Sequence, residues 1–219
     1  MIIAIDGPAA SGKSTTARLV AERLSFTYLD TGAMYRAVTL AAIEQNIDPS
    51  DQKSLKGLLD SIDLDLSTRN QETQISLNDR DVSELIRSIE VTANVSAVSA
   101  EPLVREAMVV MQRMIGNQQD CVIEGRDIGT VVFPTAEFKF FIVADYAARA
   151  HRRQLDLERL GEQRSLNELI NDLKIRDQKD SSRAHSPLRK AADAIEIDTS
   201  NLTIEQQVTL IVDQVKSRL

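Results

Sequence analysis

The stretch near the N-terminus has the residue types and the spacing of a loop that binds phosphate groups. Gly7, Gly12, Lys13 and Ser14 match the pattern Gly-x-x-x-x-Gly-Lys-Ser/Thr without a mismatch. The glycines permit backbone angles that a Cβ would forbid, so successive N–H groups can turn toward an anion. The lysine would reach the β- and γ-phosphates of a nucleotide, and the serine hydroxyl would ligate Mg²⁺. Phosphate binding is therefore assigned to the whole loop: Gly7, Pro8, Ala9, Ala10, Ser11, Gly12, Lys13, Ser14 and Thr15.

Both flanks of this loop fit the same interpretation. Residues 1–6 form a short apolar run that ends on Asp6, as a buried strand would. The apolar residues after the loop fall on one face of a helix: Ala17, Val20, Ala21 and Leu24. The N-terminus of that helix would add its free N–H groups and its positive dipole end. The alternative, a chance glycine-rich turn, explains neither flank.

Carboxylates stand where three predicted strands end, at Asp6, Asp30 and Glu124. In open α/β sheets, ligands bind at the carboxyl ends of the strands. Taken singly, each carboxylate fits the N-cap of a helix equally well. Together with the phosphate-binding loop, they predict a Mg²⁺–nucleotide site that faces a second substrate.

Basic residues gather in the last third of the chain. Of 26 Lys and Arg, 11 lie in the 42 residues from Arg149 to Lys190. Arg149 and Arg153 share one face of a helix, and Arg176 and Arg183 lie on a later helix and its exit. A charged run is often only a solvated helix face. As a set, these arginines fit phosphoryl transfer, which needs cations around several anionic groups.

Composition excludes several classes of protein. The net charge of −7 argues against general nucleic-acid binding, which needs a basic surface. One cysteine, Cys121, cannot form an intrachain disulfide and fits a reducing cytoplasm, and two histidines leave no metal cluster. No apolar run reaches 18 residues, so we expect no membrane span, and the start of the chain predicts no leader peptide.

Five apolar strands are predicted, at residues 1–6, 26–30, 121–124, 138–143 and 194–198. Helices separate them, which predicts an α/β fold with a parallel five-stranded sheet covered on both sides. Three helix starts are marked by Pro102 and by the capping boxes at 165–168 and 203–206, and Gly116 and Gly161 are predicted helix stops.

Two segments interrupt the alternation of strands and helices. Residues 62–77 alternate in places around the polar stretch 68–71, which predicts a hairpin; a solvated loop is the alternative. We interpret residues 63–100 as an inserted subdomain within one domain, 1–219. The polar segment 154–165 is a predicted lid that excludes water.

The sequence resembles the bacterial cytidylate kinases, a family of P-loop nucleoside monophosphate kinases. Five segments carry the resemblance, in family order: IDGPAASGKST (5–15), LDTGAMYR (29–36), EGRDIGTVVFP (124–134), AHRR (150–153) and RDQKDSSR (176–183). Many kinases and ATPases share the first; the second and third are specific to this family. The resemblance implies transfer of the γ-phosphate of ATP, with Mg²⁺, to CMP and dCMP in pyrimidine nucleotide metabolism.

The resemblance also implies which residues form the site. Those around the CMP would be Thr31, Arg36, Ser96, Arg105, Glu124, Arg126, Asp127, Arg176, Asp180 and Arg183. Catalysis is assigned to Lys13, Arg126, Arg153 and Arg183, with Arg149 on the ATP and Ser14 on the metal. Many members have Ser for Thr31 and Asp for Glu124, and Ser14 varies to Gly. Whether Glu124 would contact the substrate directly or through water and Mg²⁺ stays open.

Cytosine offers an amino donor beside two acceptors, so a site that selects it needs an acid or hydroxyl and a cationic donor. Ser96, Asp127 and Arg105 supply those types. The alternative is that Ser96 caps a helix and Asp127 pairs with a nearby arginine.

Three other functions remain in view. A kinase for UMP, AMP or shikimate would share the core, but Arg126, Asp127 and the insertion argue against it. A GTPase switch would need Asn-Lys-x-Asp, and the chain has no Asn-Lys. A structural ATP-binding partner does not explain the arginines. We expect a monomer in the cytoplasm that binds small molecules and neither nucleic acid nor membrane.

Overall fold

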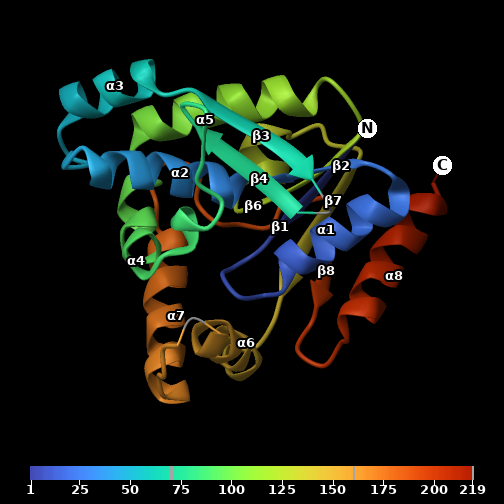
Figure 1. Ribbon diagram of the computed structural model, residues 1–219. Coiled ribbons are helices and arrows are strands. Elements are labelled where there is room, and N and C mark those ends of the chain that lie inside the picture. The colour runs from blue at the N-terminus through green and yellow to red at the C-terminus, as the bar shows by residue number, and fades with distance from the viewer. Residues whose placement is uncertain (70–71, 160, 219) are drawn as a thin grey trace.

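A parallel five-stranded sheet forms the centre of the molecule (Figure 1). The computed structural model describes residues 1–69, 72–159 and 161–218. The strands lie in the order β2-β6-β1-β7-β8, and every neighbouring pair is parallel. Their bounds are β1 (Ile2–Asp6), β2 (Thr27–Asp30), β6 (Cys121–Gly125), β7 (Phe138–Val143) and β8 (Ile195–Asp198). The predicted α/β class and all five predicted strands are confirmed.

Helices cover both faces of this sheet, so its strands are apolar on both sides. Ile3, Ile5 and Val122 pack toward α1 and α8, whereas Ala4 and Ile123 pack in the core formed with α2, α3, α4 and α5. The bounds are α1 (Lys13–Leu24), α2 (Thr31–Glu44), α3 (Gln52–Ser61), α4 (Ile89–Val98), α5 (Pro102–Gly116), α6 (Tyr146–Arg159), α7 (Leu166–Ser181) and α8 (Ile204–Lys216). Two short turns, η1 (Leu85–Arg87) and η2 (Ile128–Val132), complete the chain. Among the described residues, no helix has the length and apolar character needed to cross a membrane.

The predicted helix starts are confirmed, but one predicted stop has a different cause. Pro102 is the first residue of α5, and both capping boxes form, at Ser165 and Thr203. Gly116 does end α5, yet Asn117 caps it in a right-handed conformation, so no left-handed glycine is required. The glycine is needed for packing, since a Cβ there would lie 2.6 Å from Cζ of Phe133.

The predicted hairpin forms a second, antiparallel sheet beside α2. Its strands are β3 (Leu64–Arg69), β4 (Glu72–Leu77) and β5 (Arg80–Asp81), so the solvated-loop alternative is wrong. The centre of the predicted turn, residues 70–71, lies outside the described residues. Leu64, Ile75 and Leu77 are buried in the same core as α2, which joins this sheet to the main body.

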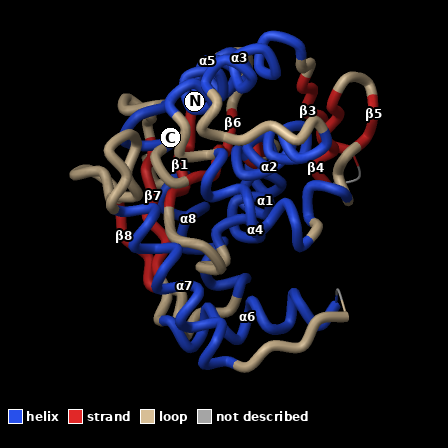
Figure 2. The backbone as a smooth tube through the Cα atoms, turned by 90° about the vertical axis from the view of Figure 1, so that its left-hand side faces the viewer, coloured by secondary structure: helices blue, strands red, loops and turns tan. Residues whose placement is uncertain are grey.

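Helices α6 and α7 pack against each other at one end of the molecule, opposite α3 and α5 (Figure 2). They have a small core of their own, which Ala150, Leu157, Leu169 and Leu173 form with Ala9 of the phosphate-binding loop. The predicted lid, 154–165, consists of the end of α6 and the connection to α7, apart from the undescribed residue 160.

Replacing Gly116 with Ala forces the ring of Phe133 to shift inside the core. We expect the free energy of unfolding to fall by about 1–3 kcal/mol, as overpacking typically costs. Gly57→Ala is the matched control, because it is also a helical glycine but has no heavy atom within 4 Å of the added Cβ. That variant should be neutral or gain up to about 1 kcal/mol. Urea unfolding of both variants measures the difference, and equal stabilities would contradict the packing role of Gly116.

Candidate functional site

The phosphate-binding loop connects β1 to α1 and depends on glycine at two points. A Cβ on Gly7 would lie 2.2 Å from the carbonyl oxygen of Ile142 in the neighbouring strand β7. Gly12 is the N-cap of α1 with φ 90, a left-handed conformation that other residues rarely adopt. The predicted need for a special backbone angle is confirmed at Gly12, whereas Gly7 is required by its close approach to β7.

Side chains from distant elements hold the outer carbonyls of this loop. Arg149 Nε donates to the carbonyl of Ala9 over 2.8 Å, and Arg152 Nη1 donates to that of Ser11 over 3.0 Å. Thr199, which follows β8, also donates to the Ser11 carbonyl, over 2.9 Å. Local patterns contain no signal for these contacts of Arg152 and Thr199, because each residue lies more than 140 positions from its acceptor along the chain.

Arg149, which is predicted to contact the ATP phosphates, is bound to protein acceptors in this structure. Its side chain is 3% exposed, and its two terminal nitrogens donate to the Asp177 carboxylate over 2.5 and 2.8 Å. All three guanidinium nitrogens thus have protein acceptors, since Nε binds Ala9. In this structure Arg149 links α7 to the phosphate-binding loop by hydrogen bonds. Its contact with ATP stays a prediction.

The carboxylate of Glu124 has three polar partners beside the phosphate-binding loop. Its Oε2 accepts from Ser14 Oγ over 2.8 Å and lies 3.5 Å from Lys13 Nζ, while its Oε1 accepts from Tyr28 over 2.5 Å. Burial, and next the charge of Arg126, lower the pKa of Lys13 to about 8, against the opposing effect of Glu124. The pKa of Tyr28 lies well above 10, mainly because the ring is buried, so the phenol stays a donor.

The other two strand-end carboxylates have structural partners. Asp6 accepts from the backbone N–H groups of Ile128 and Gly129, both over 2.8 Å, and burial raises its pKa to about 6. Asp30 caps α2 by accepting from Ala33, and its pKa also rises to about 6, through burial first and the charge of Glu124 second. Of the three candidates, Glu124 alone contacts the loop side chains.

Arginines from helices α2, α6 and α7 and from the turn after β6 form a cationic cluster, in which Arg126 and Arg176 act on Lys13. Burial, and then Arg126, lower the pKa of Arg176 to about 10. Burial also lowers the pKa of Arg36, and Arg153 and Arg126 add to this effect against the opposing charge of Asp30. Because these cations lower one another's pKa, binding of an anion with several negative charges among them is favoured.

Asp180 of α7 balances part of this cluster. It lies 3.1 Å from Arg126 Nε and also pairs with Arg183. Although burial opposes it, the charges of Arg126, Arg183 and Arg176 hold the pKa of Asp180 below its usual range. Arg36 is fixed separately, through Ile86 O and Thr92 Oγ1.

The predicted base-reading residues are only partly brought together. Arg105 Nη2 lies 2.5 Å from Asp127 Oδ2, so the predicted alternative of an Asp127–arginine pair does occur. Arg105 also lies over the ring of Tyr35, 5.4 Å from its centre. Ser96 is half-buried inside α4, whose cap is Ser88, so Ser96 does not cap a helix. Thr31, which the resemblance places around the CMP, donates its hydroxyl proton to the backbone carbonyl of Glu124 over 2.6 Å.

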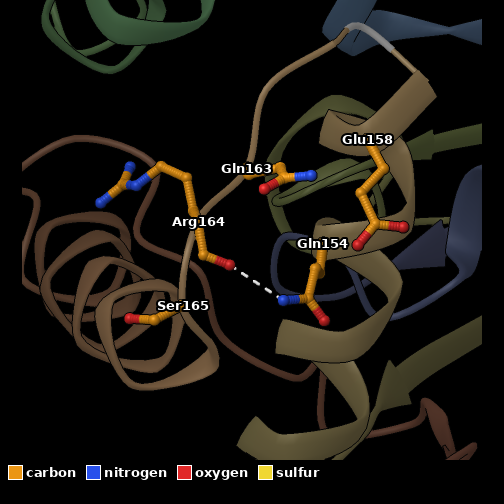
Figure 3. A pocket seen from close by; sticks show the side chains of 5 residues that line it. All are labelled: Gln154, Glu158, Gln163, Arg164 and Ser165. Carbon is orange, nitrogen blue, oxygen red and sulfur yellow. Dashed lines mark hydrogen bonds between the residues drawn. The ribbon is translucent and has the colours of Figure 1, made fainter.

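A separate open hollow of about 410 Å³ lies at the predicted lid (Figure 3). Its lining residues come from α6 and from the end of the connection that leads to α7: Gln154, Glu158, Gln163, Arg164 and Ser165. Gln154 Nε2 donates to the backbone carbonyl of Arg164 over 2.9 Å, as the dashed line shows. No residue assigned to substrate or phosphate lines this hollow, so it belongs to the lid and not to the cationic cluster.

Comparison with known proteins identifies the family. A family model described as cytidylate kinase matches residues 3–217. A cytidylate kinase from Halalkalibacterium halodurans is 50% identical over 219 residues, which is 100% of this chain and 99% of that protein. One from Lactobacillus johnsonii is 46% identical over 218 residues, covering 100% of this chain and 95% of that protein. The chain belongs to the cytidylate kinase family.

Solved structures support the fold alone. A shikimate kinase from Bacteroides thetaiotaomicron aligns with a TM-score of 0.50 and 12% identity, over 99% of this chain and 98% of that one. At that identity, the likeness covers the parallel sheet and its helices and carries no information on the substrate.

Replacing Lys13 with Met removes a cation that burial disfavours. We expect the nucleotide-free variant to be at least as stable as the wild type at pH 7. The unfolded chain keeps the Lys13 proton up to about pH 10.5, whereas the folded protein releases it near pH 8. Because the unfolded state binds more protons in that window, the wild type gains stability relative to the variant as the pH rises. Urea unfolding at pH 7 and 9.5 measures both effects; a variant that is less stable at pH 7 would contradict them.

Proposed function

We propose that this member of the cytidylate kinase family transfers the γ-phosphate of ATP to CMP and dCMP, forming ADP and CDP or dCDP. The observation that carries the proposal is the cationic cluster of Arg36, Arg126, Arg153 and Arg176 beside Lys13. One anionic ligand does not need so many cations, whereas two phosphorylated substrates that meet end to end do.

ATP would bind with its phosphates on the loop between β1 and α1, with Lys13 on the terminal groups. Ser14 and Glu124 offer a hydroxyl and a carboxylate, which suits Mg²⁺, an ion that takes few protein ligands beside waters and phosphate oxygens. Among the described residues there is no cluster of three or more His, Cys, Asp or Glu that could hold a metal, so the nucleotide would complete the site. When bound, the ion neutralises charge on the transferred phosphate.

CMP would bind opposite, beneath the subdomain 63–100. Its phosphate would meet Arg36, Arg126 and Arg176, and Asp180 with Arg183 would hold those cations in place. The base would lie near Arg105, Asp127 and Ser96, with Thr31 beside the carboxyl end of β6. A bound cytosine would then exchange part of the Arg105–Asp127 pairing for contacts with its amino group and ring acceptors.

Transfer itself requires positioning and charge stabilisation. The CMP phosphate oxygen attacks the γ-phosphorus in line, and ADP leaves, so no protein nucleophile is needed. Lys13, Arg126, Arg153 and Arg183 would stabilise the charge that spreads over the transferred group. Closure of the lid, 154–165, would exclude water and complete the arginine set. We further propose a cytoplasmic monomer, in keeping with the single, buried Cys121.

A panel of acceptors tests the reaction. We expect ADP release from ATP with CMP and dCMP, and far less with UMP, AMP, shikimate or no acceptor. Lys13→Met is the matched control and should lose at least about 100-fold in activity, because a transition-state contact worth several kcal/mol is removed. A coupled assay of ADP measures this, and a preference for AMP or shikimate would overturn the proposal.

Removing the Asp127 carboxylate or the Ser96 hydroxyl near the base should reduce the selectivity for CMP over UMP. An unpaired buried polar group costs about 1–3 kcal/mol, so Asp127→Asn or Ser96→Ala should narrow the preference for CMP over UMP by about tenfold or more. The ratio of kcat/KM for the two acceptors is the measurement. If both variants lose only overall activity and keep the ratio, other residues read the base.

A further inference from the structure

The buried phenol of Tyr28 is a polar group that neither the family motifs nor the proposed reaction uses. Tyr28 lies in β2, and its ring packs in the core between the sheet and α1 and α8. In the parallel pairing of β2 with β6, Tyr28 is level with Val122. Glu124 follows two residues later, on the same face of the sheet, because side chains alternate along a strand. The phenol therefore reaches Glu124 from the core and binds the carboxylate oxygen that Ser14 and Lys13 do not contact.

The two oxygens of the Glu124 carboxylate have different partners. Oε1 accepts from the Tyr28 hydroxyl over 2.5 Å. Oε2 accepts from Ser14 Oγ over 2.8 Å and lies 3.5 Å from Lys13 Nζ. The carboxylate is only 2% exposed, so water cannot replace a lost donor easily. Holding Oε1 from the core fixes the direction in which Oε2 faces the loop.

This arrangement determines what the Ser14 hydroxyl can do. A serine hydroxyl has one proton to donate and two lone pairs. While Ser14 donates its proton to Oε2, its lone pairs remain available for a cation on the other side. If the carboxylate turned away, the hydroxyl could rotate and present its proton to the cation, and Oε2 could move closer to Lys13.

We propose that Tyr28 is a positioning residue for the nucleotide-bound divalent cation, which acts by anchoring Glu124 so that Ser14 presents its lone pairs to the metal. The inference rests on the proposed function, because it requires a metal–nucleotide complex on the loop. Tyr28 itself touches neither nucleotide nor metal in this scheme. Its contribution therefore belongs to the metal-dependent part of nucleotide affinity and not to phosphate binding by the backbone and Lys13.

Equilibrium binding of a non-hydrolysable ATP analogue tests this without turnover. The Kd of the full-length protein for AMP-PNP is measured by calorimetry with excess Mg²⁺ and again with EDTA. For Tyr28→Phe, we expect the Kd in EDTA to stay within about twofold of the wild type, while the gain in affinity from Mg²⁺ falls by about threefold to tenfold. Mn²⁺ binding to the AMP-PNP complex, followed by electron paramagnetic resonance, should weaken to the same extent.

Two further variants separate positioning from general damage. Thr27→Val also removes a hydroxyl from β2, but at the neighbouring position, whose side chain leaves the opposite face of the sheet, so it should behave as the wild type. Tyr28→Met, which also lacks the hydroxyl, repeats the test should the Phe variant not fold, as judged by circular dichroism.

A double-mutant cycle gives the decisive comparison. In a Ser14→Ala background, Tyr28→Phe should have no further effect on the gain from Mg²⁺, because the hydroxyl through which it acts is gone. Equal weakening with and without metal, or effects of the two substitutions that simply add, would overturn the inference. The proposed reaction has a separate readout, because a failure of CMP phosphorylation in the wild type would not alter these binding ratios.

Discussion

Repulsion among cations that have little water around them is the constraint on which the rest of the structure depends. Lys13 and Arg176 are both held below their ordinary pKa by burial and by Arg126. The fold keeps this cluster together with two buried acids, Glu124 on the strand side and Asp180 on α7. The acids only partly balance the charge, and a site with this surplus is preorganised for the charge of two phosphorylated substrates, without reorganising during the reaction.

Local patterns in the sequence were enough to predict the framework. The phosphate-binding loop, the five apolar strands and the capping boxes at Ser165 and Thr203 each depend on residues within a few positions of one another. Such features follow from backbone geometry and side-chain periodicity, which a single sequence displays. The resemblance to a known family added Ser96 on α4, Arg105 on α5 and Asp180 on α7, which no local pattern had selected.

The remaining features depend on contacts between distant segments. Local patterns leave Asp6, Asp30 and Glu124 equivalent, and only the resemblance singled out Glu124. The fold supplies the physical reason, because Asp6 meets the start of η2 and Asp30 caps α2. In the same way, the residue pattern offers Arg149 only as a candidate phosphate ligand, and the fold adds its pairing with Asp177 of α7. Side chains of one type, at equally suitable positions, are distinguished by partners that lie tens of residues away along the chain, and periodicity carries no information about those partners.

Because α6 and α7 share a small core of their own with Ala9, we expect this end of the molecule to unfold locally as a unit. It contains few buried apolar side chains, so it opens at a lower free energy than the main sheet. Arg149 and Arg152 both belong to α6, and both hold carbonyls of the phosphate-binding loop. Fraying of this end would therefore loosen the loop while β1 stays folded. Backbone amides of the phosphate-binding loop should then exchange with solvent deuterium at the same rate as those of α6 and α7. A phosphate ligand that contacts the loop and α6 would slow amide exchange in both segments.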